Sequence, residues 1–285
     1  MSEKLSRLQR FYATYLEFHQ ELFNIQLICM KRLAAIVPFE KLNQIDIVSR
    51  FNQQLPILGE DNFIFKEPNT DAIFESILPL IKQYFYRSKE QLLRIAELYN
   101  RRKLPLRSLI IDQITGNKSR LQKLASKYDI PAILIEKLVE YVSEPYLELC
   151  SELLTKKLSQ YHWDRPFCPI CGNRPTMALV NEREMKRKLW CRICDTTWSF
   201  SMNGCPFCFN QDLSNLKVIF LSDRKPIRIE ACELCRNYIK TINEEIGEPI
   251  QHLSVKNVET LSLDLLAYIM GYQTFNSIKF YLETF

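Results

Sequence analysis

Four Cys-x-x-Cys pairs lie between residues 168 and 235, and they constrain the fold of this chain more than any other feature. The pairs are Cys168 with Cys171, Cys191 with Cys194, Cys205 with Cys208, and Cys232 with Cys235. Two residues between the thiols let one tight loop present both sulfurs to a single ion, so two such loops complete a four-thiolate shell. Nineteen residues separate the first two pairs, which fits a metal ribbon, and 23 separate the last two. The spacing predicts that consecutive pairs share a site.

The sequence therefore predicts two tetrahedral metal ions per chain, each held by four cysteines. One ion lies on Cys168, Cys171, Cys191 and Cys194, and the other on Cys205, Cys208, Cys232 and Cys235. Each lobe built around such a site is small, and domains below roughly 40 residues usually need a metal or a disulfide to fold. Iron and zinc both accept four thiolates, so the native metal stays open between Fe and Zn.

Other interpretations of the cysteines are weaker. A thioredoxin-like redox protein uses one reactive pair where this chain has four. Iron-sulfur clusters often add a run of closely spaced cysteines, which is absent here. An ion closed in by four cysteines has no open position for a substrate, so it usually stabilises structure. The sequence also has no glycine-rich phosphate loop, no HExxH and no GxSxG. We predict that the chain is not an enzyme.

The hydrophobic pattern predicts an α+β multidomain protein. Residues 1–162 show helical periodicity and are expected to form an all-helical domain. Short β-prone runs follow, so we expect a first zinc-ribbon-like four-cysteine lobe at 163–203 and a second at 204–285, which includes a C-terminal helix.

Helix boundaries can also be predicted. The first helix must end by Pro38, and Gly116 ends a later one. Asp71 and Asp129 are expected to be N-caps, with a separate long helix beginning near Pro145. One tail helix is expected from Asn257 to Gly271, giving the C-terminal helix of the second lobe.

Bulk properties agree with a cytoplasmic protein. Apolar residues make up 47% of the chain and charged residues 25%, and the net charge is +5. No apolar run approaches the roughly 18 residues of a membrane span, and the first residues lack the apolar segment of a secretory signal. In a reducing compartment, paired cysteines favour metal ligation over disulfides. We therefore expect no membrane insertion.

The cysteine region resembles the formate dehydrogenase accessory proteins, the FdhE family. The resemblance rests on "CPICGNRP", on "RKLWCRICDTTWSFSMNGCPFC" and on "IRIEACELCRNYIKTI", with all four pairs in the same order and spacing. It implies a helical domain followed by two rubredoxin-like lobes, which agrees with consecutive pairing. It also implies a cytoplasmic maturation factor, chaperone-like in action, that binds the catalytic subunit of respiratory formate dehydrogenase before export.

The alternative that the residues keep open is a tandem metal-ribbon protein that binds nucleic acid. The stretch "SRLQKLASKYDIPAILIEKLVEY" has the outline of a helix-turn-helix. A recognition helix presents polar side chains from its first turns, whereas here that position holds Pro131, Ala132, Ile133, Leu134 and Ile135. This helix is typical of a buried element, which argues against nucleic acid as the partner.

Overall fold

The computed structural model describes residues 2–158, 161–221, 226–245, 252–273 and 278–285. Contacts divide the chain into two compact units. Unit 1 contains residues 1–45, 58–150 and 279–285, and unit 2 contains residues 46–57 and 151–278.

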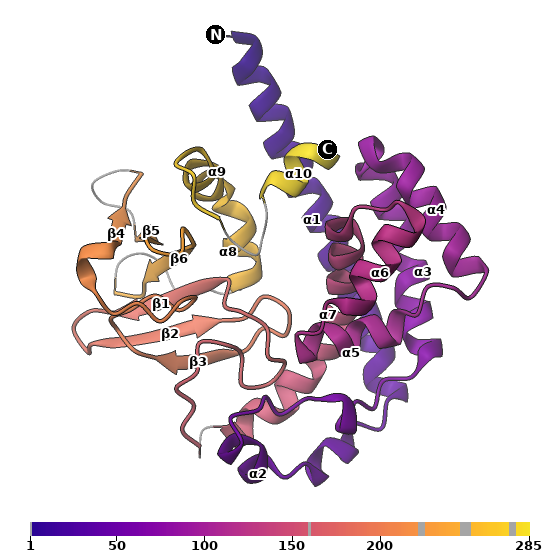
Figure 1. Cartoon of the computed structure of the whole chain (residues 1–285), viewed down its shortest axis with the longest axis horizontal. Coiled ribbons are helices and arrows are strands. Elements are labelled where there is room, and N and C mark those ends of the chain that lie inside the picture. Colours follow the sequence, from indigo (N-terminus) through magenta and orange to yellow (C-terminus); the bar gives the residue numbers. More distant parts are fainter. Residues whose placement is uncertain (1, 159–160, 222–225, 246–251, 274–277) are drawn as a thin grey trace. The chain divides into compact units, whose positions relative to one another are not determined.

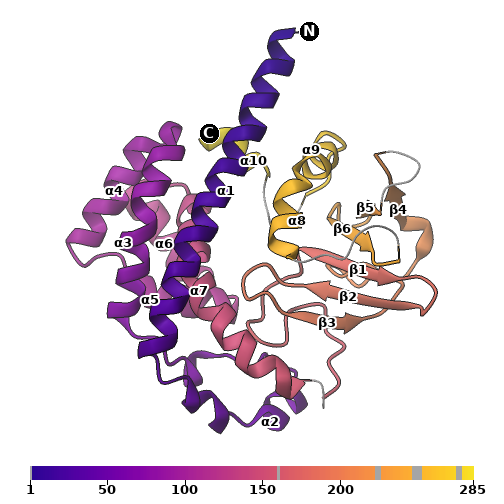
Figure 2. The same cartoon turned by 180° about the vertical axis from the view of Figure 1, so that it is seen from behind.

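Unit 1 is helical (Figures 1 and 2). Its elements are α1 (Ser2–Ile36), η1 (Phe39–Gln44), η2 (Glu60–Asn62), α3 (Glu67–Tyr84), η3 (Tyr86–Ser88), α4 (Lys89–Asn100), α5 (Leu106–Thr115), α6 (Ser119–Tyr128), most of α7 (Ala132–Leu158) and α10 (Ile278–Thr284) from Lys279 onward. As predicted, α1 ends before Pro38 and α5 ends at Gly116, which has a φ of 73°. Glycine adopts this left-handed conformation without the steric cost of a Cβ.

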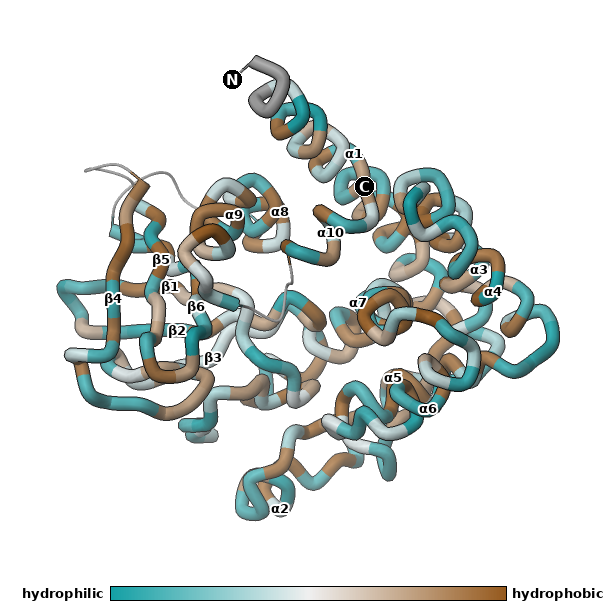
Figure 3. The backbone as a smooth tube through the Cα atoms, turned by 45° about the horizontal axis from the view of Figure 1, so that its top comes forward, coloured by the Kyte–Doolittle hydropathy of each residue, from teal (hydrophilic) through white to brown (hydrophobic). Residues whose placement is uncertain are grey.

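The long helix α7 forms much of the core of unit 1. Its residues between Leu134 and Cys150 are mostly buried on every side, and Figure 3 shows a largely hydrophobic stretch here. A helix that is apolar all round belongs in an interior. The predicted separate helix near Pro145 is wrong, because Pro145 lies inside α7. A proline removes one N–H from the helix, and the burial of Tyr141 and Tyr146 on either side of it favours a continuous helix.

Two predicted N-caps are also wrong. Asp71 lies inside α3, which begins four residues earlier at Glu67, and its carboxylate pairs with Arg102 at 2.6 Å. Asp129 has a φ of 51° and ends α6 instead of capping α7. Both aspartates stand where an N-cap is expected from sequence, but each does something else. Asp71 forms an ion pair, and Asp129 adopts the left-handed conformation, which aspartate tolerates better than most residues.

The last residues of the chain pack in unit 1. The rings of Phe285 and Phe85 lie 5.3 Å apart, and those of Tyr281 and Tyr15 lie 4.9 Å apart. The hydroxyl groups of Tyr281 and Tyr141 are 2.7 Å apart. Residues 279–285 therefore contribute to the helical core, whereas the sequence pattern placed them with the second lobe.

Unit 2 is built on one six-stranded sheet. Its strands are β1 (Met177–Asn181), β2 (Lys186–Trp190), β3 (Thr197–Phe200), β4 (Leu216–Ile219), β5 (Ile227–Cys232) and β6 (Tyr238–Asn243), in the order β3-β2-β1-β6-β5-β4. Neighbouring strands are antiparallel except β1 and β6, which are parallel, with Met177 opposite Lys240. This central pairing joins strands from both predicted lobes into one sheet. The division at residues 163 and 204 remains a prediction.

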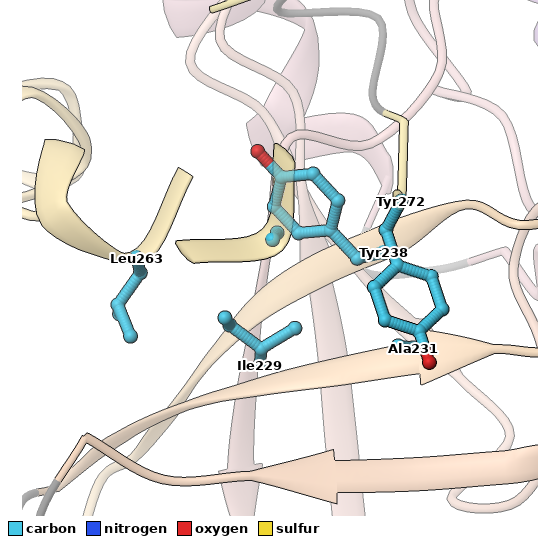
Figure 4. Packing of buried hydrophobic residues seen from close by; sticks show 6 residues of the cluster. Ile229, Ala231, Tyr238, Leu263 and Tyr272 are labelled. Atoms are coloured by element: carbon cyan, nitrogen blue, oxygen red, sulfur yellow. The ribbon is translucent and has the colours of Figure 1, made fainter. Parts of the chain in front are cut away.

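Helices α8 (Leu253–Glu259) and α9 (Leu261–Ile269) lie on one face of this sheet (Figures 1 and 2). The single tail helix expected from Asn257 to Gly271 is wrong, because the chain breaks at Thr260. Figure 4 shows Leu263 of α9 facing Ile229 of β5 and Tyr238 of β6. The break lets two short apolar faces follow the twisted sheet separately.

A buried charge network also ties the helices to the sheet. The Lys240 ammonium group donates to an Asp264 carboxylate oxygen and to the Asn257 carbonyl, both at 2.7 Å, and Tyr238 donates to the other oxygen of Asp264. Lys240 is 2% exposed and Asp264 7%. Burial lowers the pKa of Lys240, while Asp264 opposes that shift.

The predicted fold class is confirmed: a helical N-terminal region precedes a sheet that carries two four-cysteine clusters, and a C-terminal helix follows. Among the described residues, no helix is both long and apolar enough to span a membrane.

Candidate metal centre

The structure brings the eight paired cysteines together in two clusters. The first holds Cys168, Cys171, Cys191 and Cys194, and the second holds Cys205, Cys208, Cys232 and Cys235. Within each cluster all four sulfurs lie within 4.8 Å of one another. These are the two sets that the consecutive pairing predicts.

All four Cys-x-x-Cys loops have the same backbone geometry. In each loop the N–H of the first cysteine donates to the carbonyl of the residue five positions on, at 2.8 to 2.9 Å. The residue four positions on has a positive φ in every loop, and these residues are Gly172 (73°), Asp195 (55°), Phe209 (62°) and Arg236 (57°). The turn points both thiols of a loop to one side. Only the first loop has glycine at the left-handed position, where other residues incur strain.

The sequence analysis did not identify the four residues whose carbonyls close the loops. These residues are Asn173, Thr196, Asn210 and Asn237. The Asn173 side-chain amide lies 3.4 Å from the Cys171 sulfur, and the Thr196 hydroxyl lies 3.0 Å from the Cys194 sulfur. The signal was present in the sequence as the recurring ending in "CPICGN", "CRICDT", "CPFCFN" and "CELCRN". Asparagine and threonine suit this position because their side chains hydrogen-bond to nearby groups in turns.

The first cluster is closed to solvent. All four of its cysteines are 0% exposed. The N–H of Ile57 donates to the Pro169 carbonyl inside the first loop at 2.8 Å, and the Ser151 hydroxyl lies 2.7 Å from that of Thr196. Segments from two distant parts of the chain thus cover this site within unit 2.

The second cluster is partly open. Cys205 and Cys232 are buried, whereas Cys208 and Cys235 are intermediate. The tips of its two loops carry Phe209, which is 56% exposed, and Leu234, which is 67% exposed. A guanidinium nitrogen of buried Arg187 donates to the Gly204 carbonyl at 3.0 Å, just before the third loop, and another pairs with Glu230 of β5 at 2.9 Å.

Packing four thiols together in a buried site separates their pKa values. Burial, reinforced by neighbouring thiols, raises the pKa of Cys191 and of Cys194 well above the usual value. Burial also acts to raise the pKa of Cys171, but hydrogen bonds from the other thiols and from Asn173 outweigh it and lower that pKa well below the usual value. One thiolate is therefore favoured at the expense of its neighbours, as expected for like charges in a buried site. A cation would favour the thiolate form of all four.

The donor set fits a metal ion. Tetrahedral zinc with Zn–S bonds of about 2.3 Å requires sulfurs about 3.8 Å apart. The sulfurs are 3.4 Å apart for Cys168 and Cys194 and 3.7 Å apart for Cys208 and Cys232. None of the eight cysteines is in a disulfide. The two remaining cysteines, Cys29 and Cys150, are buried outside the clusters.

The fold and the site together define the class of this protein. It has a helical unit and a sheet that carries two four-cysteine metal-binding motifs. No family model matches the chain. A crystal structure of the FdhE protein from Pseudomonas aeruginosa has the same fold, with a TM-score of 0.57 and 16% identity, over 93% of this chain and 92% of that one.

Curated relatives carry the same family name. The chain is 29% identical over 120 residues to the FdhE homologue of Aquifex aeolicus, 31% over 121 residues to that of Shewanella oneidensis, and 28% over 120 residues to FdhE of Escherichia coli. Each match covers 41% of this chain and spans 42%, 39% and 38% of the respective relative. The chain is thus similar to FdhE proteins in fold over most of its length and in sequence over about 120 residues.

Proposed function

We propose that this protein is an accessory factor for the assembly of formate dehydrogenase, and that it acts by binding the catalytic subunit of that enzyme in the cytoplasm. The observation that carries the proposal is the pair of four-cysteine clusters on a fold shared with an FdhE protein, together with relatives named FdhE. The proposed action is binding without catalysis, in which the protein protects or presents its client during maturation.

The two clusters would each hold one metal ion, Fe or Zn, as a structural centre. The first would use Cys168, Cys171, Cys191 and Cys194, and the second Cys205, Cys208, Cys232 and Cys235. A bound ion would hold four thiolates together and fix the ends of the strands beside them. Four protein sulfurs at each ion leave no position for a substrate, which supports a role in binding.

The alternative of nucleic-acid binding has less support. Leu134 and Ile135, at the start of α7, are each 1% exposed. A recognition helix needs this part of its surface open to base edges. In the described residues the basic side chains near the first hairpin are also paired, since Lys186 contacts Glu184 and Arg183 contacts Glu245.

A pull-down from the native host tests the proposal. Tagged full-length protein should retain a molybdenum or tungsten formate dehydrogenase subunit, identified by mass spectrometry. Recovery of nucleic acid in place of that subunit would contradict it.

A binding assay with the purified catalytic subunit then tests the part played by the clusters. The Cys205→Ser/Cys232→Ser variant should bind weakly, because its second site cannot close, whereas Cys29→Ala serves as the control for a buried cysteine outside the clusters. Circular dichroism should show most of the helical signal retained in both. Undiminished binding by the double variant would move the interface away from the second cluster.

A further inference from the structure

A cavity of about 610 Å³ lies within the helical unit, which contains neither cysteine cluster. Its lining comes from the first turns of α1, from the turn η3 and from α10, and consists of Arg7, Leu8, Arg10, Phe11, Thr14, Tyr86, Arg87, Leu282 and Phe285. Both views of the chain show α10 beside α1 (Figures 1 and 2), and the rings of Phe11 and Phe285 lie 6.1 Å apart. The volume is in the range of ligand-binding pockets.

The charged lining is all of one sign. Among the residues that the structure describes, it contains three arginines and no aspartate or glutamate side chain. Arg87 donates to the Leu282 carbonyl at 3.0 Å and lies 5.7 Å from the Tyr86 ring, and these contacts hold its guanidinium group at the cavity. Within the described residues, neither Arg10 nor Arg87 has a carboxylate partner. The nearest acidic side chain on α10 in sequence, Glu283, is paired with Lys279 at 3.7 Å.

Three other arginines of the same unit, in contrast, form ion pairs with carboxylates. Arg94 pairs with Glu90 at 3.1 Å, Arg101 with Glu97 at 2.6 Å, and Arg102 with Asp71 at 2.6 Å. These three guanidinium groups are neutralised by carboxylates, whereas Arg10 and Arg87 leave positive charge at the cavity. A concave surface lined by one sign of charge attracts ligands of the opposite sign.

Apart from Thr14, the rest of the lining is aliphatic or aromatic. Leu8 and Phe11 stand three positions apart on α1, so both lie on one face of the helix. Leu8 is 46% exposed and Tyr86 is 58% exposed, whereas Phe285 is 6% exposed. A ligand that matches this surface combines negative charge with apolar side chains.

We propose that this cavity binds an acidic polypeptide segment that also carries apolar side chains. Its carboxylates would pair with Arg10 and Arg87, because the planar guanidinium group binds carboxylates in a bidentate manner. Its apolar side chains would cover Leu8 and Tyr86. The choice of a polypeptide over a free anion rests on the proposed function, in which a client protein supplies the segment.

Fluorescence anisotropy tests the site directly. The probe is a fluorescein-labelled hexapeptide of alternating glutamate and leucine or phenylalanine, titrated with the full-length, zinc-loaded protein. Arg10→Gln/Arg87→Gln should weaken binding about tenfold, because two charge-assisted hydrogen bonds to the peptide carboxylates are lost. Arg101→Gln is the matched control, because that arginine is exposed in the same unit but already paired with Glu97.

Three results would overturn the proposal. The first is equal affinity of the wild type and the double variant for the peptide. The second is equal affinity for a peptide with lysine in place of glutamate. The third is displacement of the peptide by free glutamate or inorganic phosphate at the same concentration, which would assign the cavity to a small anion. Arg10 and Arg87 are both exposed, so the double variant should fold, and circular dichroism checks this.

The client assay separates this inference from the proposed function. If the formate dehydrogenase catalytic subunit binds the wild type and the double variant equally, the cavity is not the client site, although the proposed function stands. If the acidic peptide binds as expected but no formate dehydrogenase subunit is retained, the cavity proposal stands and the proposed function fails.

Discussion

Gly172 offers the sharpest test of how the backbone supports the first cluster. It has a φ of 73°, and its N–H donates to the Cys168 carbonyl at 3.0 Å, which closes the first loop. A Cβ in the left-handed region costs about 1 to 2 kcal/mol. Gly172→Ala should therefore lower zinc affinity at the first cluster about 5-fold to 30-fold, because the loop must hold this conformation to present Cys168 and Cys171 together.

The matching change in the second cluster should act in the opposite direction. Phe209 has a φ of 62° at the equivalent position, and its side chain is 56% exposed. Phe209→Gly removes strain of about 1 to 2 kcal/mol, offset by about 0.5 to 1 kcal/mol for the greater freedom of an unfolded glycine. Zinc affinity at the second cluster should rise by up to about tenfold.

Competitive titration against a chromophoric zinc chelator gives the two affinities, and alkylation with mass spectrometry assigns each release step to its cysteines. Gly116→Ala is the control, because Gly116 also has a φ of 73° but ends α5, far in sequence from the clusters. It should lower the free energy of unfolding of the helical unit by about 1 kcal/mol and leave zinc affinity unchanged. If Gly172→Ala leaves the affinity of the first cluster intact, loop strain does not govern metal binding here.

Three further outcomes are expected. Total metal analysis should find about two ions per chain; Cys171→Ser/Cys191→Ser should retain one, whereas Cys171→Ser/Cys208→Ser should damage both sites. Because Cys208 and Cys235 are partly exposed, the second cluster should lose its metal to a chelator first, and its cysteines should be alkylated first. Earlier loss of metal from the first cluster would contradict the role of burial. Lys240→Met leaves buried Asp264 unpaired and should lower the free energy of unfolding by about 3 to 5 kcal/mol in urea denaturation, while Lys240→Met/Asp264→Leu should recover most of that loss.

The grouping of the cysteines could be predicted because it is a local property. Two residues between thiols fix the loop, and about 20 residues between loops span one hairpin, as between Cys171 and Cys191. The strands β1 to β4 could also be predicted from their short β-prone runs. Cysteine spacing and local β-propensity were sufficient for these two predictions, because neither depends on contacts with distant residues.

The rest of the fold depends on contacts between distant residues. The parallel pairing of β1 with β6 joins Met177 to Lys240, and neither strand alone indicates its partner. Pro145 reads as a helix boundary by local rules, but the burial of its surroundings favours a continuous α7. The packing of Phe285 against Phe85 likewise cannot be read from the periodicity of either segment.

The two clusters are connected through the one sheet that they share. Cys191 directly follows β2, and Cys232 ends β5, so each cluster holds the end of a strand. Buried Arg187 of β2 bonds to Gly204 and pairs with Glu230 of β5, which adds a second connection.

The consequences of metal loss should therefore differ between the clusters. When the second cluster opens, β6 is still paired with β1 and β5, and Lys240 still anchors it to α9. When the first opens, the loops that flank the β1–β2 hairpin are released at Cys171 and Cys191, and the segment that covers them through Ile57 loses its partner. The closed first cluster thus supports the sheet on which the open second cluster is presented, so a factor that binds a client beside the second cluster would need the first cluster intact.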